Sequence, residues 1–212
     1  MAISKKPGKS RPRPGRPTLL QGIDARAAII EAACLLFARH GIKGSSNKLI
    51  AANAGVTAAM IPYYFSNRAA LYTAVLEACF TPLCAGLPEI KSLPQLVHYF
   101  HQHLSSRPWL PLLMIREVLT PGGLLLPLFL KKFAPQVFGC FRQVLTRQVQ
   151  PLKLRKNFDI DRHVVLLMGM MVYPFMSMGV AQNLTGRKFD NNMLAGFRDD
   201  ALKLFLKGIT AG

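Results

Sequence analysis

The chain has 212 residues, half of them hydrophobic, which is enough for one large or two small domains with a substantial core. Its 27 lysines and arginines outnumber 10 aspartates and glutamates, a formal net charge of +17 that favours a polyanionic partner, although a merely soluble basic protein would show the same excess. The four cysteines have neither CxxC nor zinc-site spacing, so we expect reduced thiols in a cytoplasmic protein without metal or cofactor.

Residues 1–20 form a basic arm in which arginines alternate with prolines. Proline excludes a regular helix, so we expect this arm to be disordered without a partner. Two alternatives remain open for Arg13 and Arg16. They either enter an AT-rich minor groove, where negative potential is concentrated, or attract phosphates diffusely as part of a solubilising tail.

A first helix is predicted near Asp24–His40, with Asp24 as its N-cap and Gly41 at its end. Two short helices follow within residues 46–64 and meet at Gly55, where glycine permits the positive φ of a tight turn. Thr57 is the expected N-cap of the second of them. This order of parts predicts a helix-turn-helix, whose second helix enters the DNA major groove.

Side chains around this turn suit contact with duplex DNA. Ala58 and Ala59 are small enough to let the helix approach base edges, and Tyr63 and Tyr64 carry hydroxyls that can reach phosphates. An unrelated helical hairpin would share the bare pattern. The expected DNA-binding residues within the helices are Ser45, Ser46, Lys48, Thr57, Ala58, Ala59, Tyr63, Tyr64 and Arg68.

A fourth helix is expected from about Asn67 towards Cys79, and Pro82, Gly86 and Pro88 break its pattern. We therefore place a domain boundary there, which gives a DNA-binding domain at 21–80 and a second helical domain at 81–212.

Further helices are predicted in the second domain at 93–105, 109–119, 124–150, 161–183 and 190–208, with an interruption of 124–150 near Pro127 or Pro135. His98 and His101 lie one turn apart, but no carboxylate or thiol accompanies them, so polar surface or pocket-lining histidines are expected rather than a metal site. Arg116 and Glu117 are charges in an apolar helix that either pair locally or face a cavity. Candidate lining residues of an apolar ligand cavity, each equally suited to an ordinary core, are Trp109, Met114, Phe129, Met168, Met171 and Phe175.

The 161–183 helix is apolar on two faces. Residues 164–181 are uncharged over the length of a membrane span, and we count them as the only candidate segment of this kind. This segment contains two glycines and a proline, which argue against a membrane helix. We expect a helix packed between the core of its own domain and a second subunit, and no membrane.

Several pieces between residues 24 and 76 stand in the order and spacing of one known family: Ile30-Glu31-Ala32-Ala33, Leu36-Phe37-Ala38-Arg39-His40-Gly41, Ser45-Ser46, Ile50-Ala51, Ala54-Gly55-Val56-Thr57, Tyr63-Tyr64-Phe65-Ser66-Asn67-Arg68 and Ala70-Leu71. This segment resembles the DNA-binding domain of the tetracycline-repressor (TetR) family of bacterial transcription regulators. The departures are Pro62, where the family usually has Tyr or His, Asn47 in place of an aliphatic residue, and Arg68 in place of Lys.

The resemblance implies an all-α fold, with a three-helix helix-turn-helix domain and a C-terminal domain for effector binding and dimerisation through the last two helices. It also implies a repressor that binds a near-palindromic operator on double-stranded DNA. An apolar or aromatic small-molecule inducer would release it. The alternative is a nonspecific or architectural DNA-binding protein. No GxSxG, HExxH, P-loop or paired carboxylates support an enzyme.

Overall fold

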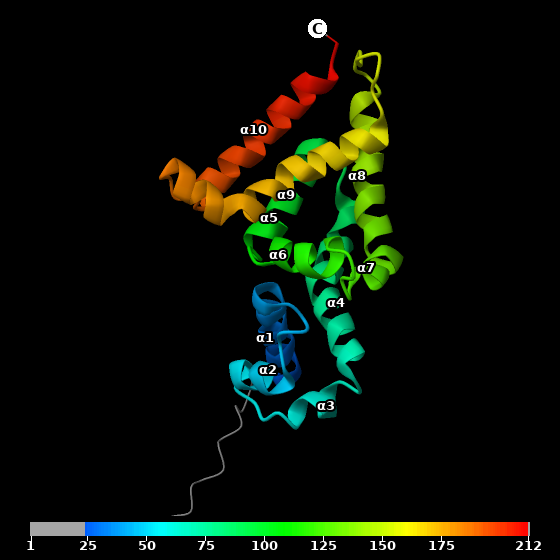
Figure 1. Cartoon of the computed structure of the whole chain (residues 1–212). Coiled ribbons are helices and arrows are strands. Elements are labelled where there is room, and N and C mark those ends of the chain that lie inside the picture. Colours follow the sequence, from blue (N-terminus) through cyan, green and yellow to red (C-terminus); the bar gives the residue numbers. More distant parts are fainter. Residues whose placement is uncertain (1–23, 212) are drawn as a thin grey trace, which may run out of the picture.

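The computed structural model describes residues 24–211, and these form an all-helical molecule, as expected (Figure 1). Three helices at one end are α1 (Ala25–His40), α2 (Asn47–Ala54) and α3 (Met60–Tyr64). The predicted basic arm at 1–20, with Arg13 and Arg16, lies outside the described residues. Among those residues the only β pairing is an isolated bridge between Leu154 and Thr210.

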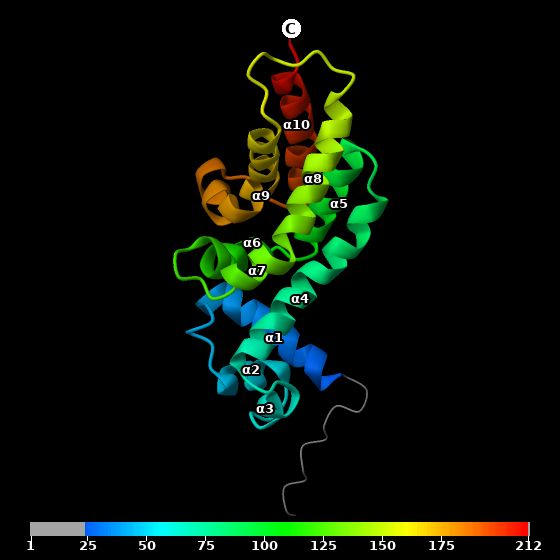
Figure 2. The ribbon, with the colours of Figure 1, turned by 90° about the vertical axis from the view of Figure 1, so that its right-hand side faces the viewer.

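The remaining elements form the larger body. They are α4 (Arg68–Gly86), a 3₁₀ turn (Leu87–Glu89), α5 (Leu93–Ser105), α6 (Leu110–Met114), a π-helix (Ile115–Leu119), α7 (Leu126–Lys132), α8 (Ala134–Val149), α9 (Ile160–Thr185) and α10 (Asn191–Ile209). Figure 2 shows α4 running from the three-helix end into this body, whose far end is built by α8, α9 and α10.

Local chemistry sets the ends of α1 as predicted. The Asp24 carboxylate accepts a hydrogen bond from the backbone N–H of Arg26 at 2.9 Å, which satisfies one of the free donors of the first turn. Gly41 follows the helix with φ +71° and donates its N–H to Phe37 O. The fully buried side chains of Ile29 and Phe37 anchor α1 in the core.

Helix α4 is longer than predicted, because it continues through Pro82 to Gly86. A proline inside a helix removes one backbone donor, and here the last turn gains a donor from another helix. The Tyr99 hydroxyl lies 2.9 Å from the carbonyl oxygens of both Pro82 and Leu83. Gly86 leaves room for this ring, since a Cβ there would lie 2.3 Å from Tyr99 Oη. The division at residue 80 stays a prediction, because a single helix crosses it.

Prolines begin helices in the 124–150 region. The predicted interruption is present at Phe133, between α7 and α8. Pro127 and Pro135 each stand in the first turn of the helix that follows, where a missing N–H costs no helical hydrogen bond. The fixed φ of proline also favours helix initiation at these two points.

Helix α9 buries one of its two apolar stripes and leaves the other uncovered. Val164, Leu167 and Phe175 are buried, whereas Tyr173 and Val180 are about two-thirds exposed. Two segments, Arg68–Glu89 and Ile160–Thr185, are long and apolar enough to cross a membrane by length and composition, which is weak evidence by itself. Of the two, only the second contains an uncharged stretch of 18 residues, at 164–181, because Glu77 interrupts the first.

Candidate nucleic-acid interface and cavities

Gly55 forms the turn between α2 and α3. Its φ of +68° and ψ of +26° are left-handed, as predicted, and a side chain would be strained there. The N–H groups of Gly55 and Val56 both donate to Ala51 O, the latter at 3.0 Å, which closes the C-terminal end of α2.

Helix α3 begins differently from the prediction. Ala59 is its N-cap and no side chain makes a capping hydrogen bond, so the prediction of Thr57 as a side-chain cap is wrong. Instead, Thr57 O accepts from the backbone N–H of Met60 at 3.0 Å. Pro62 is the third helical residue, within the first turn, where its missing donor does not interrupt the helix.

The outer side of α3 carries the predicted contact residues. Tyr63 is 80 % exposed, and Ala58 and Ala59 are exposed before it. Tyr64 is half-buried, and its ring meets that of Tyr63 edge-on with centroids 5.1 Å apart. Ile61 is buried on the opposite side and holds the short helix to the core. This arrangement leaves the Tyr63 hydroxyl free to reach a partner.

Two adjacent serines have different roles. Ser45 is completely buried and donates its hydroxyl to Gly41 O at 2.7 Å, so the predicted DNA contact by this side chain is wrong. Ser46 is exposed and is the N-cap of α2, where its Oγ accepts from Leu49 N at 3.2 Å. Lys48, in the first turn of α2, is exposed and stays a candidate.

The exposed Arg68 side chain donates hydrogen bonds to the loop before α2 and to its own helix. Its Nε donates to the Tyr72 hydroxyl at 2.8 Å and its Nη1 to Asn47 Oδ1 at 3.1 Å. Its Nη2 donates to the carbonyl oxygens of Ile42, at 3.1 Å, and Ser45, at 2.9 Å. The structure therefore gives Arg68 a part in positioning the loop before α2. Because the residue is exposed, its contact with phosphate stays a prediction.

Sequence reasoning missed the contact made by Glu117. This carboxylate is 92 % buried and accepts a hydrogen bond from Ile42 N at 2.8 Å. Glu117 does not pair with Arg116. Both residues instead line an open hollow of about 200 Å³, which is separate from the apolar cavity described next. The available signal is an acid in an otherwise apolar helix, but its partner, a backbone N–H 75 positions away, cannot be identified from local sequence.

An apolar cavity of about 200 Å³ lies inside the body, between α4, α5, α6, α7, α8 and α9. Three of the six predicted ligand-lining residues, Met114, Phe129 and Met168, contribute to it. Its thirteen lining residues are apolar except for one histidine: Phe80, Leu83, Phe100, His103, Leu104, Leu110, Pro111, Met114, Leu119, Phe129, Val137, Met168 and Val172.

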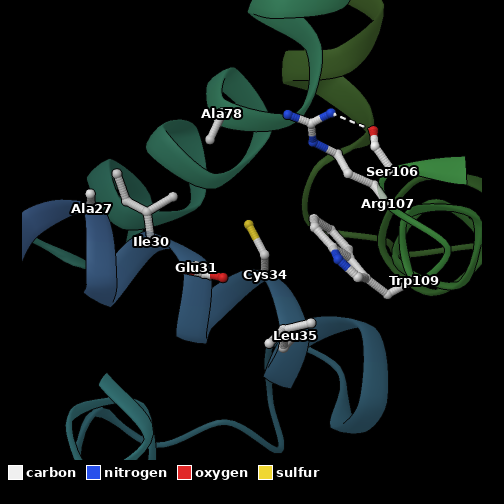
Figure 3. A pocket seen from close by; sticks show the side chains of 9 residues that line it. All are labelled: Ala27, Ile30, Glu31, Cys34, Leu35, Ala78, Ser106, Arg107 and Trp109. Atoms are coloured by element: carbon white, nitrogen blue, oxygen red, sulfur yellow. Dashed lines mark hydrogen bonds between the residues drawn. The ribbon is translucent and has the colours of Figure 1, made fainter. Parts of the chain in front are cut away.

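The other three predicted residues lie elsewhere. Met171 and Phe175 line a separate hollow of only about 10 Å³. Trp109 lines an open cleft of about 430 Å³ between α1, α4 and the connection from α5 to α6. Figure 3 shows its indole facing Cys34 across this cleft, with Arg107 and Ser106 joined by a hydrogen bond at the rim. The six residues therefore do not form one site.

His103 is the single polar residue of the apolar cavity. Burial, and to a lesser extent the nearby Arg107 guanidinium, lowers its pKa to about 4, against a smaller opposing effect of Cys79 O. Arg107 Nη1 lies 3.4 Å from His103 Nδ1. The cavity is thus lined by a neutral imidazole near pH 7. Burial also lowers the pKa of the neighbouring His101. No group of three metal-ligating side chains occurs within residues 24–211.

Comparison with known proteins gives matches of two kinds. Residues 29–75 match the family model described as bacterial regulatory proteins, tetR family. A 63-residue segment is 40 % identical to the HTH-type transcriptional repressor SCO4008 of Streptomyces coelicolor. That segment covers 30 % of this chain and spans about a third (33 %) of the length of the repressor.

Solved structures resemble nearly the whole chain. FadR of Bacillus subtilis, a transcriptional regulator crystallised with stearoyl-CoA, aligns with a TM-score of 0.65 at 18 % identity, covering 86 % of this chain and 98 % of that one. SmeT, the repressor of the Stenotrophomonas maltophilia efflux pump SmeDEF, aligns with a TM-score of 0.60 at 19 % identity, covering 88 % and 90 %. At such identities the likeness establishes the fold alone.

Proposed function

The chain belongs to the tetR family of bacterial regulatory proteins, and from this premise we propose that it is a ligand-responsive transcriptional repressor of a near-palindromic operator. The observation that carries the proposal is the exposed outer side of α3, presented by the Gly55 turn and ending in a solvent-facing tyrosine. The net charge of +17 favours approach to DNA.

The proposed DNA contacts divide by chemistry. Ala58 and Ala59 lie nearest the bases, because small side chains let α3 approach the groove floor. The proposed phosphate contacts are Ser46, Lys48, Thr57, Tyr63, Tyr64 and Arg68, together with Arg13 and Arg16 of the arm. Phosphate contacts fix the orientation of the protein and carry no sequence information directly.

We propose a homodimer through α9 and α10. These helices carry seven of the thirteen exposed large hydrophobic side chains among the described residues: Val165, Leu166, Tyr173, Val180, Leu184, Phe197 and Leu204. A concentrated apolar face of this kind marks an interaction surface. Two-fold symmetry would place two α3 helices on one rigid particle, as a palindromic operator requires. The dimer interface would also cover the apolar stripe of α9, so no membrane is needed to bury it. We further propose that the protein is cytoplasmic and is not an enzyme.

The proposed effector is an apolar or aromatic small molecule held in the cavity around Met114, Phe129 and Met168. The lining offers neither a carboxylate nor a cation, and the one histidine is neutral near pH 7. FadR was crystallised with a ligand that has a long acyl chain, a ligand class that agrees with an apolar interior. A screen in which only strongly anionic or zwitterionic compounds raise the melting temperature would contradict this part.

Selection of bound duplexes from a random-sequence pool tests the DNA-binding function. The expected result is one enriched, near-palindromic site that stays bound when nonspecific DNA is added in excess. Equal competition by every duplex would overturn the proposal. It would favour the alternative, a nonspecific or architectural DNA-binding protein.

A further inference from the structure

The loop between α1 and α2 is held from two directions. From one side, Arg68 at the start of α4 donates to Ile42 O and Ser45 O. From the other side, Glu117 of the π-helix accepts from Ile42 N, a contact between residues 75 positions apart. The Ile42 residue thus has both of its backbone polar groups bonded to charged side chains from different parts of the fold.

Local structure fixes Glu117 in its place. Leu125 N donates to Glu117 O at 2.9 Å, so the segment after the π-helix folds back on it. Gly123 makes this approach possible, because a Cβ there would lie 2.4 Å from Glu117 O. A Cβ at Gly41 would lie 3.1 Å from Glu117 Oε1, so glycine is also favoured on the opposite side of the carboxylate. These contacts hold the Glu117 backbone in place and leave room for its carboxylate beside Gly41.

The same segment builds a wall of the apolar cavity. Leu110, Pro111 and Met114 of α6 and Leu119 of the π-helix all line that cavity. Glu117 lies between Met114 and Leu119 in sequence, on a helix type that is rare and occurs often at functional sites. A displacement of this wall would therefore change the position of the carboxylate that holds Ile42.

We infer that Glu117 is a positioning residue that ties the cavity wall to the loop leading into α2. The inference rests on the proposed function, in which the cavity controls the helix-turn-helix. The Glu117–Ile42 hydrogen bond would be a second connection between the two, in addition to helix α4, which joins them covalently. An occupant of the cavity that displaces residues 110–119 weakens the Glu117–Ile42 bond. The loop then loses one of its two supports, and the orientation of α2 and α3 relative to the body is less fixed.

Amide hydrogen exchange at Ile42 in the full-length protein tests the bond without any DNA. Glu117→Ala should accelerate Ile42 exchange at least tenfold, whereas Glu117→Gln, which keeps a carbonyl acceptor, should restore most of the protection. A core amide such as that of Leu71 should be unchanged in both variants, since loss of global stability would accelerate every amide. Glu89→Ala, at an exposed carboxylate, is the matched control.

The link to the cavity is tested by a substitution that occupies it. Val172→Phe places a larger side chain in the cavity from α9, on a residue far from Glu117 in sequence. We expect Ile42 exchange to accelerate in this variant, and the same substitution to add little in the Glu117→Ala background.

Unchanged Ile42 exchange in Glu117→Ala would overturn the inference. So would a Val172→Phe effect on Ile42 exchange that is just as large in the Glu117→Ala background as in the wild type. Failure to find a preferred duplex would instead contradict the proposed function. The two failures are distinct, because the exchange experiment contains no DNA.

Discussion

At the scale of single residues, Tyr63 is available to a partner, because it is 80 % exposed and no hydrogen bond within the described residues engages its hydroxyl. Tyr63→Phe removes only that hydroxyl. We expect it to weaken binding to all duplexes by a similar factor, about 5- to 10-fold, because a lost phosphate contact carries no sequence preference. Binding titrations against the selected and a scrambled duplex measure this.

The thermal midpoint of Tyr63→Phe should match that of the wild type, since the hydroxyl supports no internal contact. Ser66→Ala, at an exposed position beyond α3, is a suitable control for the titrations. A variant that loses affinity for the selected duplex alone would place Tyr63 at a base edge instead of a phosphate.

The buried His103 side chain is expected to lower the unfolding free energy of the protein at acidic pH. Its pKa is lowered to about 4 in the folded protein from an ordinary value of 6.5, so the unfolded chain binds a proton that the folded chain does not. The stabilisation is complete above pH 6.5 and is lost as the pH falls towards 4. His103→Leu should therefore reduce the fall in unfolding free energy between pH 7 and 4 by roughly 2 kcal/mol.

Denaturant unfolding of both proteins across that pH range tests the prediction. His98→Gln, at an exposed histidine on the same helix, should leave the pH dependence close to that of the wild type. A His103→Leu protein with an unchanged pH profile would rule out His103 as the source. The lowered pKa of His101 acts in the same direction, so part of the acid lability will remain.

The sequence predicts which residue types lie near the candidate interface, but not whether each side chain faces the solvent or bonds within the protein. Tyr63 and Ala58 are expected at the surface and are exposed, whereas Ser45 is assigned to DNA but is buried and bonds to Gly41 O. Polar residues near a helix terminus can satisfy either phosphates or unpaired backbone groups. Whether a polar side chain bonds within the protein depends on which carbonyl oxygens the tertiary fold places near it. The local sequence does not determine that arrangement.

At the scale of elements, the Gly55 turn separates α2 from α3 through a left-handed residue. Gly55→Ala should lower the unfolding free energy by about 1 kcal/mol, because an L side chain is strained at φ +68°. Gly196→Ala is the matched control: it lies within α10 with open space around its Cβ position, so alanine should stabilise it slightly.

Denaturant unfolding of the two glycine variants gives the comparison. The two substitutions should have opposite signs, and Gly55→Ala should also weaken duplex binding because it alters the angle between the two short helices. A Gly55→Ala protein as stable as the wild type would mean that this turn tolerates another backbone conformation.

Helix boundaries were predictable where a local signal decides them. Asp24, Gly41 and Gly55 act within their own turns, so their roles followed from the residue and its neighbours. The passage of α4 through Pro82 was not predictable, because it depends on a hydroxyl from Tyr99, 17 residues away. The π-helix at 115–119 likewise accompanies a long-range contact of Glu117.

At the scale of the whole molecule, the uncovered apolar residues lie on α9 and α10, in the part of the body away from the three-helix end (Figure 2). Val180 and Leu204 are both about two-thirds exposed on this face. In a two-fold symmetric interface each of these residues is buried once in each subunit. Each residue therefore contributes twice to the stability of the dimer. The proposed interface is therefore sensitive to single substitutions.

Val180→Glu combined with Leu204→Glu should convert the dimer to a monomer at micromolar concentration, because four carboxylates would then be buried without partners. Sedimentation velocity measures the change. Leu130→Glu, at a leucine 55 % exposed on α7, should leave the assembly intact. Because each half-site alone is bound weakly, the double variant should also lose the selected palindrome while keeping its helical content. A double variant that remains dimeric would place the second subunit on another face of the molecule.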